Sequence, residues 1–218
     1  MDGCTVTMIK FLNISFLLAT LLMINAANAS EEDSLTALMQ RMKSDVAVKI
    51  AYQEIRTLEL MDQPWNGSGY MYALAPDLMI REQLKPQRLL MGVKGDRLFY
   101  FDPENGMRHQ MEMDISNPLS MNIAVFKALI NADQELLMRL YRVKFEHKTK
   151  RWLMTLSSKQ TPETGLSIMV SGLPGQQADT IVTKQPDGDL SEFLMQKQAT
   201  DEALDETVQH LYQELSGE

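Results

Sequence analysis

The 218-residue sequence predicts an α+β fold in which one antiparallel sheet curls into an incomplete, half-closed β-barrel around a helical lid or plug. Two observations support this prediction. Roughly ten segments alternate apolar and polar residues and are joined by tight turns without crossover helices, and a sheet of that size must curl or split. A helical stretch interrupts the strands at residues 117–142, and a helix is the natural object to fill the resulting trough.

A secretory signal peptide is predicted at the N-terminus. Lys10 precedes an apolar run over residues 11–24, and Ala27-Asn28-Ala29 forms a small-x-small cleavage site. The run is shorter than the roughly 20 apolar residues that a membrane span requires, and an uncleaved anchor is the alternative. We therefore expect residues 1–29 to be removed before Ser30 and the protein to be exported.

The remainder, residues 30–218, is expected to form a single acidic domain. Cys4 is the only cysteine and lies in the leader, which excludes disulfides, thiol nucleophiles and cysteine metal sites from the mature chain. The formal charge of -8 is unchanged by cleavage, because Asp2 and Lys10 are removed together. An acidic balance argues against nucleic acid and anionic lipid surfaces as partners.

Strand signals dominate this domain after a first helix. An amphipathic helix is predicted over residues 35–42 with Ser34 as its cap, since apolar residues recur at i, i+3, i+4 and i+7. Strands are predicted where apolar residues alternate, and turns where Gly, Pro, Asn and Asp cluster. The strand segments lie within 46–52, 70–75, 88–102, 111–115, 145–158, 165–175 and 180–195, and the turns at 63–69, 76–77, 85–86, 94–96 and 102–106.

Two further helical segments complete the pattern. Residues 117–142 carry apolar residues at helical spacing with a break near 131–133, which predicts a helical hairpin inserted between strands. A final helix is predicted after Thr200, because apolar residues line one side of the segment that follows. These residues are Leu204, Val208, Leu211 and Leu215.

The hairpin RLLMGVKGDRLFYFD, residues 88–102, is apolar on both faces. Leu98 and Tyr100 point to one face of its second strand, and Phe99 and Phe101 point to the other. One face is expected to meet the inside of the trough, and the other to be covered by the N-terminal helix, the C-terminal helix or another strand layer. A filled sandwich, in which both faces are simply core, is the alternative to a trough.

Residues 67–106, GSGYMYALAPDLMIREQLKPQRLLMGVKGDRLFYFDPENG, resemble the periplasmic outer-membrane lipoprotein carrier (LolA-like) family. Pro76-Asp77-Leu78-Met79 matches a Pro-Asp/Asn-apolar strand of that family, and residues 93–103 match its hairpin. The resemblance implies a monomeric periplasmic carrier that shields the acyl chains of a lipoprotein or another lipidated molecule in a hydrophobic cavity. It also implies an inner-membrane donor complex and an outer-membrane acceptor as partners.

Three positions depart from the family pattern. Ala75 stands where the family has an Arg that holds the helical lid shut, and Met79 and Arg81 stand where aromatic residues are expected. The latch therefore does not carry over to this chain. The expected cargo is either a lipoprotein or a different acylated molecule.

The methionine content suits a carrier. About 15 methylenes at roughly 0.8 kcal/mol each make an acyl chain in water unfavourable by about 12 kcal/mol, yet the cargo has to be released. Methionine repacks easily around irregular or absent ligands. The sequence has 17 Met, and 14 remain when Met1, Met8 and Met23 leave with the signal peptide. As a population they favour an adaptable interior, although each alone is ordinary core.

No sequence motif indicates catalysis. His109, His147 and His210 are not at metal-ligand spacing, and the sequence lacks a nucleophile elbow, a phosphate loop and a dinucleotide fingerprint. No catalytic residue, metal site or cofactor is expected, although a carboxylate pair formed through space would leave no such motif. The alternative to a carrier is a periplasmic adaptor or sensor module on the same fold that binds a protein or peptide.

The candidate cargo site combines strand residues at apolar family positions with residues of the predicted lid. They are Met79, Phe99 and Phe101 from the strands and Phe126, Leu129, Ile130 and Leu137 from the lid. Phe101→Asp is expected to abolish uptake of an acyl probe. A shift of the strand faces by one residue would instead place Tyr70, Tyr72 and Tyr100 inside.

Overall fold

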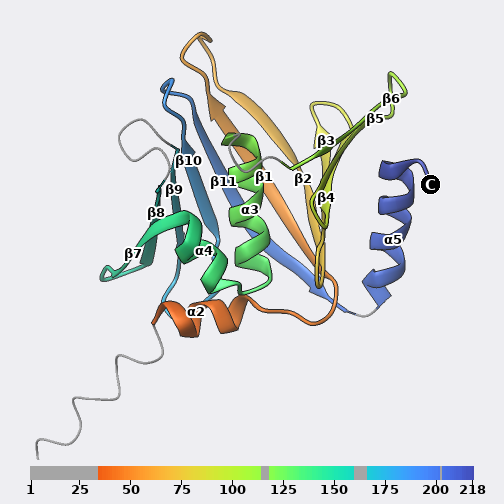
Figure 1. The fold of residues 1–218 in the computed structure, drawn as a ribbon. Coiled ribbons are helices and arrows are strands. Elements are labelled where there is room, and N and C mark those ends of the chain that lie inside the picture. The colour runs from red at the N-terminus through yellow and green to blue at the C-terminus, as the bar shows by residue number, and fades with distance from the viewer. Residues whose placement is uncertain (1–33, 114–117, 160–165, 202) are drawn as a thin grey trace, which may run out of the picture.

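The computed structural model describes residues 34–113, 118–159, 166–201 and 203–218, which form four helices and one sheet of eleven strands (Figure 1). The strand order is β6-β5-β4-β3-β2-β1-β11-β10-β9-β8-β7, and every neighbouring pair is antiparallel. The sheet does not close, because β6 and β7 end it on either side. The predicted α+β fold with a half-closed antiparallel sheet is therefore confirmed. The signal peptide and its cleavage site lie outside the described residues.

Two groups of strands meet at the β1–β11 pair. The first group is β1 (Val48–Thr57), β2 (Trp65–Leu74), β3 (Leu78–Lys85), β4 (Leu89–Lys94), β5 (Arg97–Asp102) and β6 (Met107–Glu112). The second group is β7 (Tyr141–His147), β8 (Trp152–Ser158), β9 (Ser167–Gly172), β10 (Thr180–Lys184) and β11 (Leu190–Thr200). Each group is a meander in which strands that follow one another in sequence also pair.

The helices form where the sequence places caps and apolar stripes. They are α2 (Leu35–Met42), α3 (Pro118–Ile130), α4 (Gln134–Leu140) and α5 (Ala203–Ser216). The Ser34 hydroxyl accepts a hydrogen bond from the Ala37 amide at 3.1 Å, as the predicted cap requires. Asp133 caps α4 in the same way, which ends the break between the two inserted helices.

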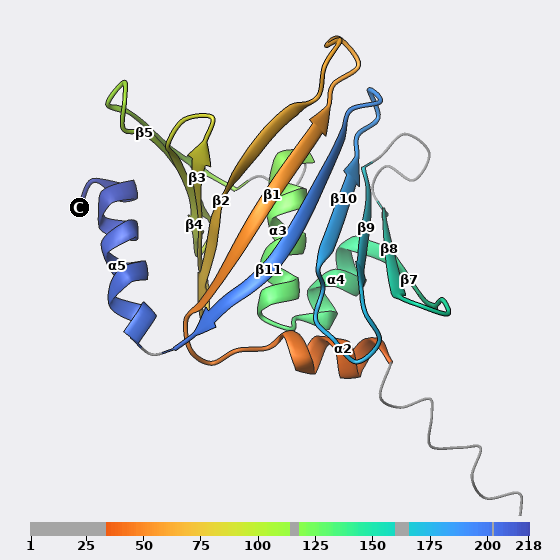
Figure 2. The ribbon, with the colours of Figure 1, turned by 180° about the vertical axis from the view of Figure 1, so that it is seen from behind.

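The two ends of the sheet bend toward the same side, and α3 lies between them (Figures 1 and 2). The helix α2 crosses one end of this trough, while α5 packs on the opposite face of the sheet against β2–β6. The C-terminal helix is thus the cover that the second apolar face of the hairpin requires. Gly92 makes this close packing possible, since a Cβ there would lie 2.6 Å from Leu215 Cδ2.

The trough is filled mainly on the side of β7–β11. There α2, α3 and α4 pack on the strands in one core cluster, which includes Leu38, Met39, Val125, Leu129, Leu137, Trp152, Met154, Ile168 and Ile181. Tyr52 of β1 and Met71 of β2 belong to the same core cluster. A second core cluster lies under α5 and includes Tyr72, Ile80, Leu90, Phe99, Phe101, Val208, Tyr212 and Leu215. The half of the trough beside β7–β11 is thus mainly filled, as in the predicted sandwich. The half beside β1–β6 is mainly vacant, as in the predicted trough.

The predicted turn at residues 63–69 is wrong in its second part, because β2 already begins at Trp65. Gly67 and Gly69 serve the strand instead. A Cβ on Gly69 would lie 2.0 Å from the backbone oxygen of Glu82 on β3, and one on Gly67 would lie 2.3 Å from the Trp65 ring. The glycines in this stretch permit close approach between neighbouring groups rather than a change of direction.

Candidate functional site

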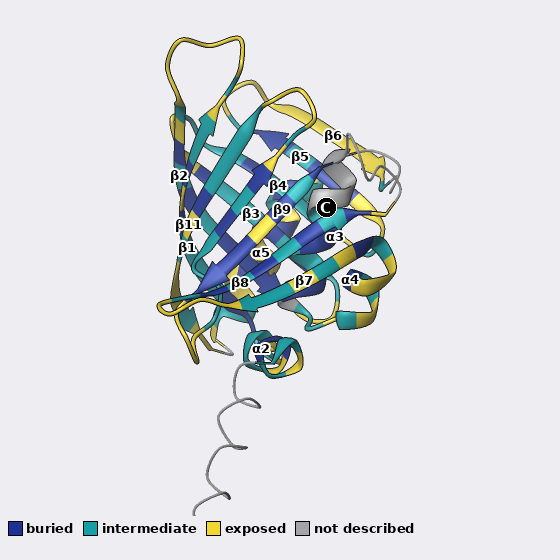
Figure 3. Cartoon of the chain, turned by 90° about the vertical axis from the view of Figure 1, so that its left-hand side faces the viewer, coloured by how far each residue is buried: buried dark blue, intermediate teal, exposed yellow. Residues whose placement is uncertain are grey.

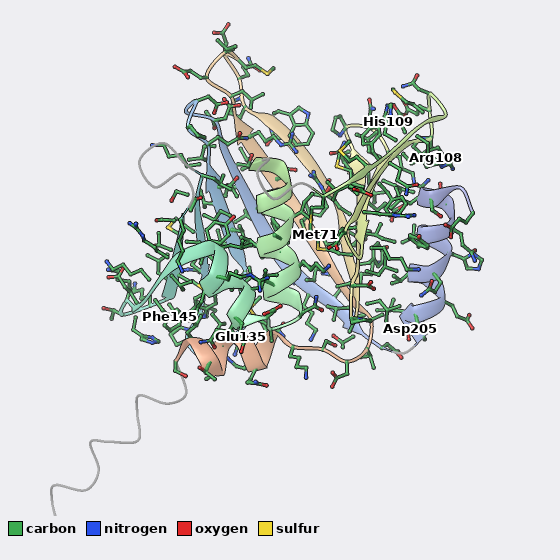
Figure 4. The ribbon with its side chains drawn as sticks, in the orientation of Figure 1. Met71, Arg108, His109, Glu135, Phe145 and Asp205 are labelled. Atoms are coloured by element: carbon green, nitrogen blue, oxygen red, sulfur yellow. The ribbon has the colours of Figure 1, made fainter. Side chains whose placement is uncertain are left out.

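A cavity of about 780 Å³ lies between α3 and the concave face of the sheet, mainly on the β1–β6 side, and Thr183 of β10 and Ser191 and Phe193 of β11 complete its lining. Its apolar lining is Leu58, Met71, Met79, Met91, Leu98, Phe99, Tyr100, Met107, Met111, Ile123, Phe126 and Phe193. Figure 4 shows Met71 between α3 and the neighbouring strands, on the wall of this space. The volume is within the range of about 300–1,000 Å³ that is usual for small-molecule sites.

Methionines supply the walls and the mouth of the cavity. Met71, Met79 and Met91 come from the adjacent strands β2, β3 and β4, and Met107 and Met111 come from β6. β6 is an edge strand whose residues are all exposed (Figure 3), with Met107 at 44% and Met111 at 54%. The apolar lining thus reaches the protein surface along β6, and flexible side chains line the space throughout.

One row of the wall can be followed across five strands. Met71 on β2 is opposite Arg81 on β3, which is opposite Met91 on β4, and the row continues through Tyr100 on β5 to His109 on β6. Cross-strand partners share a face of the sheet, so all five side chains belong to the concave face. All five residues line the cavity. Arg81 therefore lies in the middle of a largely apolar wall.

The helix α3 closes the cavity from the open side of the trough. Ile123 and Phe126 line the cavity from this helix, and the Phe126 ring packs edge-on against Phe193 at a centroid distance of 5.8 Å. Lys127 Nζ donates a hydrogen bond to the Gly95 carbonyl oxygen at 2.8 Å. This contact connects α3 to the β4–β5 turn, which matches the position expected of a lid.

A charged cluster forms part of the cavity lining. The Glu54 carboxylate, whose side chain is 1% exposed, pairs with the Arg81 guanidinium and accepts a hydrogen bond from Arg56 Nε at 2.5 Å. Arg81 also donates through Nε to the Tyr52 hydroxyl at 2.8 Å and through Nη2 to Gln83 Oε1 at 3.3 Å. The carboxylate is thus shared by two guanidinium groups.

Aromatic rings hold the Arg81 guanidinium in place. Its central carbon lies 4.9 Å from the Tyr52 ring centroid and 5.7 Å from that of Phe193. Burial raises the pKa of the Tyr52 phenol above its ordinary value of 10.0, and the neighbouring Arg81 opposes that shift. Tyr52 is therefore a neutral acceptor for Arg81 at neutral pH.

The structure places some of the predicted site residues at the cavity and others in the packed half. Met79 and Phe126 line the cavity. Leu129 and Leu137 are 1% exposed and belong to the core cluster on the β7–β11 side, so they support the lid without lining the space. The side chain of Ile130 lies outside the described residues.

The predicted placement of Phe101 inside the trough is wrong, because its side chain belongs to the cluster under α5 and does not line the cavity. Phe99 borders the cavity, but its ring packs edge-on against Tyr212 of α5 at 5.6 Å. On β5 it is Leu98 and Tyr100 that face inward. For β5, the alternative prediction that Tyr100 lies inside the trough is therefore correct.

For β2, the alternative prediction that Tyr70 and Tyr72 lie inside the trough is wrong. Tyr70 and Tyr72 lie with the cluster under α5, while Met71 lines the cavity. The Tyr72 hydroxyl donates to Glu82 Oε2 at 3.4 Å on that outer side. The two strands therefore present residues of opposite parity to the concave face, which reflects the register through β3 and β4.

Sequence reasoning did not identify Glu54 and Arg56 as part of the site. A signal was present, because both residues continue the alternation of Ile50 and Tyr52 on β1. Charged residues on the apolar face of a strand are unusual and indicate either buried pairing or binding. Arg81 was noted only as a departure from an expected aromatic residue.

The described part of the chain contains no cluster of three or more His, Cys, Asp or Glu side chains suited to a metal ion. No helix among the described residues is both long and apolar enough to cross a membrane.

A family model described as outer membrane lipoprotein carrier protein LolA-like matches residues 26–216. None of the curated proteins matches the chain significantly. Among solved structures, the chain is similar to a LolA superfamily protein from Nitrosomonas europaea, with 8% identity and a TM-score of 0.44 over 78% of this chain and 94% of that one. It is also similar to a DUF1329 family protein from Desulfovibrio piger, with 8% identity and a TM-score of 0.46 over 74% of this chain and 88% of that one.

Proposed function

Since the chain belongs to the outer membrane lipoprotein carrier protein LolA-like family, we propose that it is a periplasmic carrier. It shields the acyl chains of a lipoprotein or another lipidated molecule in the cavity between α3 and β1–β6, and delivers that cargo toward the outer membrane. The carrier needs no catalytic step, because binding and release only exchange one apolar environment for another.

The observation that supports this proposal most directly is the vacant, methionine-lined half of the trough. A filled core would leave no space of about 780 Å³ between its helix and its sheet. Here five methionines line such a space, and the lid that covers it carries its own apolar residues, Ile123 and Phe126. Side chains of this kind adapt to a guest and to its absence.

The same proposal specifies how the protein is exported and how it transfers its cargo. Residues 1–29 direct export and are cleaved before Ser30, and the mature monomer receives cargo from an inner-membrane donor complex and passes it to an outer-membrane acceptor. The intact mass of protein recovered from periplasm tests the cleavage site. Native mass spectrometry of the same sample reports the monomer and the mass of any bound lipid.

The test of carrier function is uptake of a fluorescent fatty acid by the purified mature protein. Met79→Glu places a carboxylate in the apolar wall, and we expect it to weaken binding of the probe by about tenfold or more, since the wall loses apolar contact with the acyl chain and the new carboxylate must be desolvated when that chain fills the cavity. Met169→Glu is the matched control. Met169 lies on β9 between the core residues Ile168 and Val170, is 38% exposed and faces away from the trough.

Thermal unfolding of both variants shows whether they remain folded under the conditions of the assay. Equal loss of probe binding in Met79→Glu and Met169→Glu would contradict the proposed cavity. Binding of peptides by a protein that takes up no acyl probe would favour the adaptor module instead.

A further inference from the structure

We propose that the cavity selects an acyl chain that ends in an anionic group, a carboxylate or a phosphate, and that Arg81 and Arg56 bind this group. The inference rests on the proposed carrier function and specifies the class of its cargo. It starts from Arg81, which lies between Met71 and Met91 in the wall of the cavity. A guanidinium in an apolar wall is costly unless it is paired, so its partners decide what it does.

The protein supplies too little negative charge for the two arginines. Glu54 pairs with both Arg81 and Arg56, so one carboxylate faces two guanidinium groups and one positive charge remains. Asp189 is the other carboxylate of the lining, and its Oδ1 accepts the backbone amide of Glu59 at 3.0 Å. Within the described residues, Asp189 forms no ion pair with either arginine.

Several donors of the two guanidinium groups have no acceptor in the described part of the protein. Arg81 uses Nε and Nη2 and leaves Nη1, and Arg56 uses Nε and leaves both terminal nitrogens. The planes of the groups are nevertheless held, because Arg56 lies 4.7 Å from the Trp65 ring centroid and Arg81 lies over Tyr52. Ordered guanidinium groups with unused donors are suited to carboxylate or phosphate oxygens.

A neutral end group would leave this charge without a partner. Ester, alcohol and thioether groups accept weakly, and a guest that displaces water from the cavity would remove the solvation of the remaining positive charge. A carboxylate or phosphate would pair with that charge while its acyl chain contacts the methionines. The cavity is therefore suited to an amphiphile with an anionic end and less suited to a neutral acyl glyceride.

The experiment compares ligands of equal chain length in displacing the neutral dye 1-N-phenylnaphthylamine from the mature protein. Palmitate and hexadecyl phosphate carry the anionic end, and hexadecanol is the neutral match. We expect both anions to bind about tenfold more tightly than hexadecanol at low salt. The tighter of the two anions indicates whether a carboxylate or a phosphate source fits better, and either order supports the proposal.

Two variants should shift this preference in opposite directions. Arg56→Gln keeps the Arg81–Glu54 pair but removes the excess charge, so the preference for palmitate over hexadecanol should fall toward equality. Glu54→Gln removes the competing carboxylate and should increase the preference. Arg142→Gln, an exposed arginine on β7 outside the cavity lining, is the charge-matched control and should leave the preference unchanged.

The outcomes separate the two proposals. Equal affinity for palmitate and hexadecanol, unchanged in Arg56→Gln, would overturn the selection of anions and leave the carrier function intact. Failure of all three ligands to displace a bound dye, or failure of the dye to bind, would overturn the carrier function itself. Arg56 is partly exposed, so its variant keeps the test decisive if Glu54→Gln does not fold.

Discussion

At the scale of single residues, the position of each side chain along its strand decides whether it lines the cavity or packs into the protein's own core. On β5 the side chains of both faces are apolar, and the two faces differ only in what covers them. Leu98 and Tyr100 face the cavity, whereas Phe101 packs in the cluster that contains Tyr212 of α5. The Arg108 guanidinium lies 3.8 Å from the Phe101 ring centroid, which completes the cover on that side. Figure 4 shows Arg108 near the end of α5.

This placement changes the expected effect of altering Phe101. Phe101→Ala removes a ring that is 9% exposed, and we expect it to lower the free energy of unfolding by about 3 kcal/mol through lost burial and a cavity under α5. Affinity for an acyl probe should stay within about twofold of the wild type. Urea unfolding measures the first quantity and probe titration the second. Loss of affinity with unchanged stability would show that Phe101 lines the cargo site after all.

At the scale of elements, α5 is held by charge as well as by apolar packing. The Arg88 guanidinium makes two contacts with the Glu214 carboxylate, one of them at 2.9 Å, and also pairs with Glu82 at 2.9 Å. Arg108 Nη2 donates to the Glu214 backbone oxygen at 2.7 Å. These contacts join the last turns of α5 to β3, the β3–β4 connection and β6, and so fix the helix over the outer cluster.

The Arg88–Glu214 pair predicts a dependence of stability on pH. The hydrogen bonds from Arg88 hold the pKa of Glu214 below its ordinary value of 4.5, so the unfolded chain binds a proton there more readily than the folded chain. The contribution of the pair is therefore complete above about pH 5 and is lost as the pH falls through the lowered pKa. Arg88→Gln should destabilise the protein by about 1 kcal/mol near neutral pH and by less in acid, because the pair is partly exposed.

Urea unfolding of wild type and Arg88→Gln, at about pH 7 and about pH 3.5 in low salt, measures this difference. Arg97→Gln, an exposed arginine at the start of β5, controls for the change in net charge. A difference between wild type and Arg88→Gln that grows on acidification would contradict the assigned role of Glu214.

The elements themselves were largely predictable from local signals. Four predictions that depend on local sequence are confirmed. They are the cap at Ser34, the break at Asp133, the hairpin around Gly95 and the apolar stripe of the last helix. Gly67 was misleading, because a glycine that permits close packing in a strand has the same sequence signal as one in a turn. Local sequence therefore predicted the elements better than it predicted their exact bounds.

The cavity was less predictable, because it depends on contacts between residues far apart in the chain. Alternation shows that β5 has two apolar faces, but only the packing of Tyr212 on Phe99 determines which face is outside. In the same way, the pairing of Arg81 with Glu54 joins residues on strands that do not neighbour each other. Met79 was identified from the resemblance to the family, and Phe126 was identified because it lies in the predicted helical insertion.

At the scale of the whole molecule, the fold divides the trough into a packed half and a vacant half. The packed half gives the single sheet a rigid core, in which Trp152 and Met154 are fully buried in one cluster with residues of α2, α3 and α4. The vacant half faces α3 from the other side, and the same helix therefore contributes to the core and to the wall of the cavity. Most of the contacts that keep the chain folded therefore do not depend on what occupies the vacant half, as the proposed carrier function requires.

Methionines are distributed over both halves and can report on this division. Met79 and Met91 line the cavity and Met39 and Met154 are buried in the core cluster, whereas Met71 belongs to both. In NMR spectra of protein labelled at the methionine methyl groups, saturation with palmitate should shift the signals of Met79 and Met91 and leave those of Met39 and Met154 in place. Single Met→Leu variants assign the signals, because this substitution conserves volume. Shifts of Met39 and Met154 as large as those of the cavity methionines would mean that cargo enters the packed half, and that the trough functions as one adaptable space rather than two.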